Sequence, residues 1–137
     1  MKITDLLKES NIILNAKATS KQDVLEQITC LMDKSGNVAN LETYRKDVLA
    51  REQESSTGVG ESIAIPHAKS SGIKNAGLVA MVLPNGVDFD SLDNQPVKLI
   101  FLIGVPNKAE NTHLDILSNL STLLMNQESV LNRQTFL

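Results

Sequence analysis

Residues 78–83 read Leu-Val-Ala-Met-Val-Leu, and residues 99–103 read Leu-Ile-Phe-Leu-Ile. Neither run alternates apolar with polar side chains, so both predict strands that are buried on both faces of a sheet. The two strands therefore place the centre of a β-sheet in this part of the chain. Between them the sequence predicts turns at 84–86 and 93–96, with a short strand over 87–89.

Helical periodicity surrounds these strands. Ser20 resembles an N-cap with an acid three residues later, and apolar residues then recur at helical spacing, which predicts a helix over about residues 20–34. Asn40 predicts the cap of a second helix, and a long amphipathic helix is expected from about Thr112. A short first helix and a brief edge strand at 12–14 precede them. The predicted fold class is α/β, a mixed β-sheet sandwiched between helices in a single domain.

Size and charge exclude several classes of protein. The chain has 137 residues, which fits one domain, and its three Phe, one Tyr and no Trp leave little for base stacking. Thirteen Lys and Arg against sixteen Asp and Glu give a net charge of −3, the wrong sign for a surface that binds nucleic acid or anionic lipid. We therefore expect no nucleic-acid partner and no direct insertion into a membrane.

The cysteine content and the ends of the chain bear on its location. The single cysteine, Cys30, cannot form an internal disulfide, and Asp5 lies where a signal peptide would begin its apolar stretch. A cytoplasmic protein is expected. Residues 129–131 predict a last helix that ends at Leu137 after barely two turns. We therefore expect one domain over 1–137 whose C-terminal helix is truncated, or a fragment of a longer polypeptide.

Residues 55–67, Ser-Ser-Thr-Gly-Val-Gly-Glu-Ser-Ile-Ala-Ile-Pro-His, fit neither periodicity and predict a constrained loop. Gly58 and Gly60 allow positive φ or close approach of a ligand, and the hydroxyls of 55–57 lie beside backbone amides. Such a loop can surround an anion with hydrogen bonds. It has neither the Gly-Lys-Ser/Thr of a P-loop nor the setting of a dinucleotide fingerprint, so no ATP, NAD or other cofactor is expected.

The loop ends at His67, one of the two histidines in the sequence. Pro66 has a fixed φ and favours an extended Ile65, so the chain presents His67 in a fixed direction. A neutral imidazole can act as base, metal ligand or nucleophile, or can simply satisfy its hydrogen bonds at a strand end. His113 falls in the first turn of the last predicted helix, where backbone amides favour a nearby anion, although a partly solvated histidine at the core margin fits equally. Without a short ligand spacing or a cysteine partner, the two histidines predict no metal site.

Two charged residues flank this loop. Arg51 ends the second predicted helix, where its guanidinium could steady phosphate oxygens or could pair with the helix C-terminus. Glu61 could orient an imidazole or be solvated.

Several strings in this region together resemble the signature of the fructose/mannitol-type enzyme IIA domains of the bacterial phosphoenolpyruvate-dependent sugar phosphotransferase system. They are Arg51-Glu52, Ser56-Thr57-Gly58-Val59-Gly60, Ile63-Ala64-Ile65-Pro66-His67-Ala68, Phe89-Asp90, the strand at 99–103 and His113-Leu114. The similarity runs in order over essentially the whole chain. Ser62 departs from it, because many relatives have glycine there, and a positive φ at that site would strain a serine modestly.

The resemblance implies an α/β sandwich around a mixed sheet, with His67 accepting a phosphoryl group and His113 as a second histidine of the pocket. It implies that Arg51 and Glu61 support the site. The segment Ser56, Thr57, Gly58, Val59 and Gly60 would then bind phosphate through its amides, without metal.

The function implied is that of a phosphotransferase component, a phosphohistidine relay. The phosphocarrier protein HPr would donate to His67, and a IIB domain, which connects to a membrane IIC component, would accept the group for sugar uptake. Fructose, mannitol and galactitol-like sugars all remain open. One alternative is a regulatory IIA-like module, either nitrogen-related or part of a transcription regulator, whose phosphorylation state controls partner binding. Another is a metal-assisted hydrolase that uses both histidines.

Overall fold

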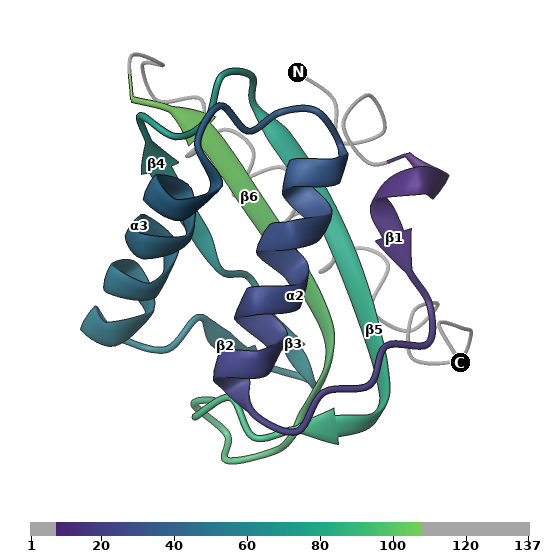
Figure 1. The fold of residues 1–137 in the computed structure, drawn as a ribbon. Helices are drawn as coiled ribbons and strands as arrows, with labels where there is room; N and C mark the ends of the chain where they lie inside the picture. The colour runs from purple at the N-terminus through teal and green to yellow at the C-terminus, as the bar shows by residue number, and fades with distance from the viewer. Residues whose placement is uncertain (1–7, 108–137) are drawn as a thin grey trace.

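The computed structural model describes residues 8–107, which form a six-stranded mixed sheet with two helices against one face (Figure 1). In chain order the elements are a 3-10 helix (Glu9–Asn11), β1 (Ile12–Ile13), α2 (Lys21–Lys34), α3 (Leu41–Glu54), β2 (Gly58–Gly60), β3 (Ile63–Ala64), β4 (His67–Ser70), β5 (Gly77–Val87) and β6 (Val97–Pro106). The predicted α/β class with a mixed sheet is confirmed. The helices predicted before residue 8 and after residue 111 lie outside the described residues.

Both predicted helices begin at the predicted caps. The Ser20 hydroxyl accepts a hydrogen bond from the Asp23 amide, and the Asp23 carboxylate accepts one from the Thr19 amide, each at 3.1 Å. This reciprocal pair satisfies amides that the first turn of α2 would otherwise leave unpaired. At the start of α3 the Asn40 side chain accepts from the Thr43 amide at 3.0 Å.

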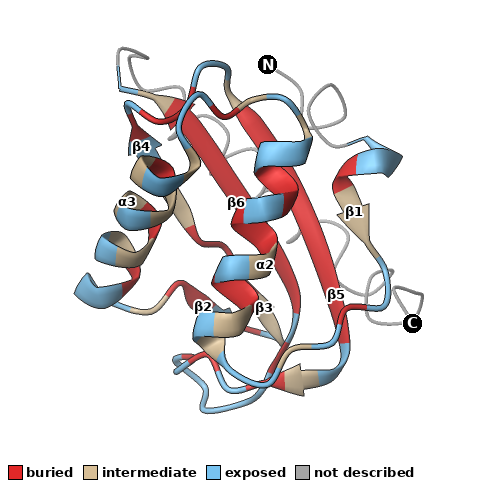
Figure 2. Ribbon diagram, viewed as in Figure 1, coloured by how far each residue is buried: buried red, intermediate tan, exposed pale blue. Residues whose placement is uncertain are grey.

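The two apolar runs form the centre of the sheet, as predicted. Strands β5 and β6 pair antiparallel, with Ala80 opposite Phe101, while β1 pairs parallel with β5 at one edge, as expected of the short strand near residue 12. Alternate side chains enter two separate apolar clusters, and the cluster that contains Val79 and Ile100 packs against α2 and α3. Burial on both faces explains why these sequences do not alternate (Figure 2).

Two sequence predictions about connecting segments are wrong. The expected turn at 84–86 lies within β5, where the pairing shifts register between Val82 and Val87, so these residues form a bulge. The expected loop at 55–67 instead forms the β2–β3 hairpin and the start of β4. Strands of two and three residues are too short to show a period, which is why the pattern did not indicate them.

No helix among residues 8–107 has the length and apolar character that spanning a membrane requires.

The hairpin turns at Glu61 and Ser62, whose φ angles are 57° and 63°. Two consecutive residues with positive φ are typical of a type I′ turn, which favours Asn and Gly and disfavours other side chains. The strain expected at Ser62 is therefore present in the fold.

We predict that Ser62→Gly raises the free energy of unfolding by about 0.5–1 kcal/mol, because relief of left-handed strain exceeds the added entropy of the unfolded chain. Urea denaturation measures the change. The control is Ser71→Gly, an exposed serine outside the left-handed region, which should leave stability equal or lower. Equal effects of the two substitutions would contradict the prediction.

Candidate functional site

His67 lies where one edge of β6 changes its pairing partner. Strands β3 and β4 pair in parallel with the same edge of β6, one after the other, and Ile65-Pro66 separates them. Proline has no N–H, so it interrupts the ladder, while the Pro66 carbonyl accepts from the Ile103 amide at 3.1 Å. The break leaves His67 half-buried as the first residue of β4, paired with Ile103.

Within residues 8–107, one hydrogen bond orients the imidazole ring of His67. Nδ1 of His67 lies 3.0 Å from the carbonyl oxygen of Ile65. Because a carbonyl oxygen only accepts, the contact places the ring proton on Nδ1 and leaves the Nε2 lone pair available in the neutral ring. Nε2 is therefore the ring atom that can attack an electrophile.

The Ile65 carbonyl is itself held in place. The Ile65 amide donates to the carbonyl of Thr57 at 3.0 Å, so the backbone on both sides of this residue is constrained. The segment between α3 and β2 thus determines where the acceptor for the His67 ring lies.

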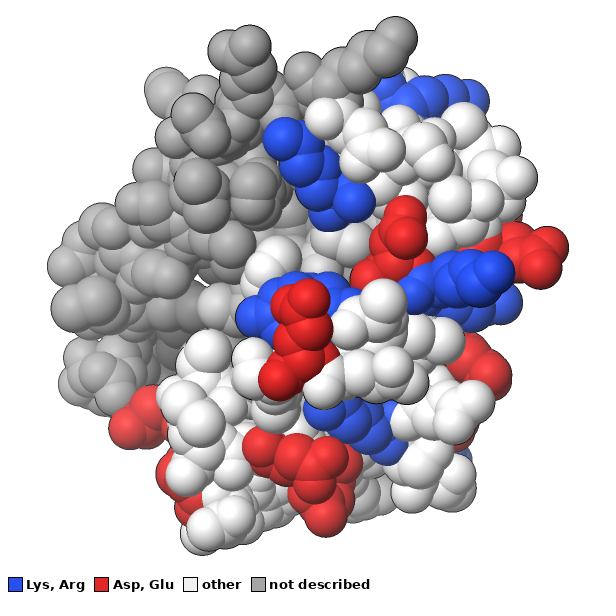
Figure 3. All heavy atoms as spheres, turned by 90° about the vertical axis from the view of Figure 1, so that its left-hand side faces the viewer, with Lys and Arg blue, Asp and Glu red and all other residues white. Residues whose placement is uncertain are grey.

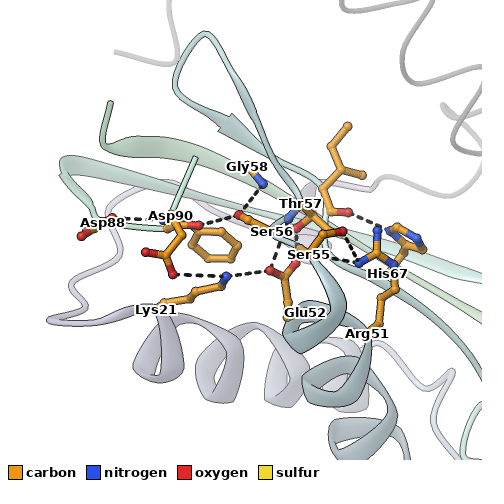
Figure 4. A network of polar contacts seen from close by, with 12 residues as sticks. Lys21, Arg51, Glu52, Ser55, Ser56, Thr57, Gly58, His67, Asp88 and Asp90 are labelled. Carbon is orange, nitrogen blue, oxygen red and sulfur yellow. Dashed lines mark hydrogen bonds and ion pairs between the residues drawn. The ribbon is translucent and has the colours of Figure 1, made fainter. Parts of the chain in front are cut away.

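Arg51 comes from the last turn of α3, the helix that packs against β4. Its Nη1 donates to the carbonyl and the hydroxyl of Ser55, at 2.9 and 3.5 Å, so the ordinary interaction with a helix C-terminus is present. Within the described residues this uses one of the guanidinium nitrogens. Figure 4 shows the side chains of Arg51 and His67 at the same end of a polar network, where a guanidinium could bind phosphate oxygens.

The residues predicted to surround an anion already have partners inside the protein. The Thr57 amide donates to a Glu52 carboxylate oxygen at 3.3 Å, and the Gly58 amide donates to the Ser56 hydroxyl at 3.0 Å. That hydroxyl donates to the Phe89 carbonyl at 2.6 Å. Val59 and Gly60 continue this segment as part of β2. The structure therefore uses residues 56–60 to join elements and does not gather the Thr57 and Gly58 amides into an anion-binding ring.

Glu61 is not brought to His67. It lies at the hairpin tip, where its amide donates to Asp93 at 3.2 Å. The neighbouring Ser62 carbonyl accepts from Lys98, five positions along β6 from Ile103, which faces His67. At about 3.3 Å per residue the two sites are roughly 16 Å apart along the strand. His113 lies outside the described residues.

Sequence reasoning assigned no role to Glu52, which is buried with 6% of its surface exposed. Its carboxylate accepts from the amide and the hydroxyl of Thr57 and pairs with Lys21 Nζ at 2.8 Å. Tyr44, Val48 and Glu52 are the buried residues of α3, and their spacing of four is that of an inward helix face. A glutamate at the spacing of this inward face was the feature of the sequence that could have indicated a buried carboxylate.

Tyr44 holds β6 at the level of the histidine. Its hydroxyl donates to the Ile103 carbonyl at 3.0 Å, and the approach is close because a Cβ at Gly104 would lie 3.0 Å from the same hydroxyl. Complete burial raises the pKa of the Tyr44 phenol well above its usual value of 10.0.

No group of three His, Cys, Asp or Glu side chains within residues 8–107 could hold a metal ion.

Comparison with known proteins places this geometry in context. Residues 5–134 match the family model described as the phosphoenolpyruvate-dependent sugar phosphotransferase system, EIIA 2. The chain is 44% identical over 128 residues to the fructose-specific EIIABC component of Bacillus subtilis, covering 93% of this chain and 20% of that protein. It is 35% identical over 124 residues to a nitrogen regulatory protein of Pseudomonas aeruginosa, and the match covers 90% of this chain and 80% of that protein.

A solved structure shares the fold. The complex of enzyme IIAMTL and phosphorylated enzyme IIBMTL from Escherichia coli matches with a TM-score of 0.78 and 30% identity, covering 93% of this chain and 88% of that chain. The chain spans about a fifth of the length of the Bacillus protein and most of the length of the Pseudomonas protein.

The position of Tyr44 predicts an alkaline transition. Because the folded-state pKa exceeds the unfolded value, stability is intact below about pH 10 and falls as pH rises above it. Tyr44 is the only tyrosine, so tyrosinate absorbance should appear together with loss of helical circular dichroism. Tyr44→Phe should cost about 1–3 kcal/mol by leaving the Ile103 carbonyl unpaired. Ionisation near pH 10 with an intact fold would contradict the assignment.

Proposed function

The chain belongs to the EIIA 2 family of the phosphoenolpyruvate-dependent sugar phosphotransferase system, and we propose that it is a phosphoryl carrier whose acceptor atom is Nε2 of His67. The observation that supports this most directly is the contact from Nδ1 to the Ile65 carbonyl, since it leaves Nε2 as the nucleophile on a half-buried ring. The proposal treats residues 1–137 as one EIIA type-2 domain.

The proposed reaction needs no proton to leave the acceptor. The Nε2 lone pair forms a bond to the phosphorus of a donor phosphohistidine, the donor N–P bond breaks, and its electron pair returns to the donor ring. The His67 ring then carries positive charge, which strengthens the hydrogen bond from Nδ1 to Ile65. Onward transfer reverses these steps toward the next acceptor.

Such a transfer depends mainly on alignment and on charge stabilisation. The Ile65 carbonyl supplies alignment, and the Arg51 guanidinium supplies positive charge for the transferred oxygens. His113 completes the proposed pocket as its second histidine. Glu61 is left out of this pocket because it lies at the far end of the β3 pairing.

The partners in this proposal are HPr as donor and a IIB domain as acceptor, in the cytoplasm, with IIB connecting to a membrane IIC component. Similarity to a IIA protein solved with phosphorylated IIB supports the second partner. The net charge of −3 suits a donor with a positive face. On the side of the molecule where α3 and β4 lie, acidic and basic side chains are interspersed (Figure 3), so docking there would not rely on a single block of charge.

A regulatory role is the second candidate, because the chain is also similar to a nitrogen regulatory protein. Both roles use the same phosphorylated histidine. They differ in whether the phosphoryl group passes to IIB and a sugar, or whether phosphorylation only changes affinity for a regulated partner. Incubating the phosphorylated chain with IIB, and measuring whether the phosphoryl group leaves His67 for IIB, separates the two roles.

Incubation with phosphoenolpyruvate, enzyme I and HPr should add one acid-labile phosphoryl group on His67, detected by mass spectrometry before and after acid treatment. His67→Ala should abolish the label, because no other nitrogen replaces Nε2. His113→Ala should slow the transfer and leave the fold intact. An acid-stable label on the His67→Ala protein would refute the assignment.

Arg51→Ala should lower the rate of transfer from phospho-HPr roughly 10- to 100-fold, because it removes a charged donor from the transferred group. Arg51→Lys should recover only part of the rate, since lysine lacks the planar fork of arginine. The matched control is Arg45→Ala on the same helix, whose guanidinium contacts Thr29 at 3.0 Å on α2. Rapid-quench measurements decide, and equal rates for the two alanine variants would exclude the role of Arg51.

A further inference from the structure

An ion pair between a partly exposed lysine and a buried glutamate lies beside the proposed site and takes no part in the transfer described above. Lys21, the first residue of α2, pairs with Glu52 at 2.8 Å, and the Glu52 side chain is only 4% exposed. Lys21 Nζ also lies 4.7 Å from the centre of the Phe89 ring. Three separate parts of the chain therefore meet at the Lys21 ammonium group.

The ion pair is connected to the His67 ring by a chain of hydrogen bonds, and Figure 4 shows its two ends, the contacts of Glu52 with Thr57 and the ring of His67. The Glu52 carboxylate accepts from the Thr57 amide and hydroxyl, and the Thr57 carbonyl accepts from the Ile65 amide. The Ile65 carbonyl then accepts a hydrogen bond from His67 Nδ1. This path joins the end of α3 to the start of β4.

The same carboxylate also affects Arg51, its neighbour in sequence. Holding Glu52 fixes the rotation of the last turn of α3, since consecutive residues in a helix point about 100° apart. Arg51 in turn bonds Ser55, within the segment that Glu52 and Thr57 close. The two groups proposed to contact the phosphoryl group therefore depend on one anchor.

We propose that Glu52, paired with Lys21, is a positioning residue for His67: it fixes Thr57 and thereby the Ile65 carbonyl that orients the ring. The inference rests on the proposed function, since it assigns the purpose of that orientation. Replacing a buried ion pair with apolar side chains is often neutral for stability, so stability alone does not account for one at this place. The need for a fixed geometry accounts for the ion pair, because misplacing a reacting group by about 1 Å can slow a reaction up to 100-fold.

The test compares Thr57→Val, which replaces the hydroxyl with a methyl group, with Thr57→Ser, which keeps the hydroxyl. It also compares Glu52→Gln with Glu54→Gln. Glu54 is an exposed glutamate on the same helix. The first readout is single-turnover transfer from phospho-HPr over a range of donor concentrations. The second is the pair of ring nitrogen signals of His67 in a protein labelled with 15N-histidine, assigned with His113→Gln.

Thr57→Val and Glu52→Gln should lower the rate at saturating donor about tenfold, with an unchanged half-saturating concentration. Their His67 signals should move toward a mixture of the two neutral tautomers. Glu54→Gln should match the wild type in both readouts, and Thr57→Ser should recover what Thr57→Val loses in each of them. A change in stability alone would not lower the rate at saturating donor while leaving the half-saturating concentration of donor unchanged. It would also not shift the ring nitrogen signals of His67.

Wild-type rates and wild-type ring signals in folded Glu52→Gln and Thr57→Val would overturn the inference. Should Glu52→Gln fail to fold, the two Thr57 variants decide the question. Absence of any phosphoryl group on His67 in the wild type would refute the proposed function instead. The ring signals of the unphosphorylated proteins would still test the positioning role in that case.

Discussion

Within the described residues, strand β6 pairs directly with three of the other five strands of the sheet. One edge binds β5 antiparallel, and the other edge binds β3 and then β4 in parallel. A strand with both edges paired and both faces buried has little freedom to change its register. The consequence for the site is direct, because the register of β6 determines where His67 and Ile103 meet.

The interruption between β3 and β4 places the proposed acceptor, His67, at the point where the pairing with β6 resumes. An unbroken ladder would direct the carbonyls of this segment to a neighbouring strand. Pro66 has no N–H to continue the ladder, and the carbonyl of the preceding residue, Ile65, accepts a hydrogen bond from the side chain of His67. The same backbone break therefore orients the ring and selects its tautomer.

The elements that could be predicted from the sequence are those with long runs of patterned residues or a recognisable helix cap. The runs at 78–83 and 99–103 predicted the central strands because burial on both faces removes alternation, and Ser20 and Asn40 predicted the two helix starts. The β2–β3 hairpin was missed because its strands are too short to carry a period. The motif led to Glu61 as a site residue, although the distance along β6 separates it from His67.

Glu52 shows why chemistry around a site is harder to predict than the site itself. A charged residue near a helix end is normally solvated, so its type alone favours the surface. Its partners, Lys21 and Thr57, become visible only when α2 and the segment before β2 converge. The burial of Glu52 follows from its position and not from its residue type, because the four-residue spacing from Tyr44 and Val48 points the carboxylate inward. A buried carboxylate needs donors, and here those donors belong to the backbone that holds the His67 ring.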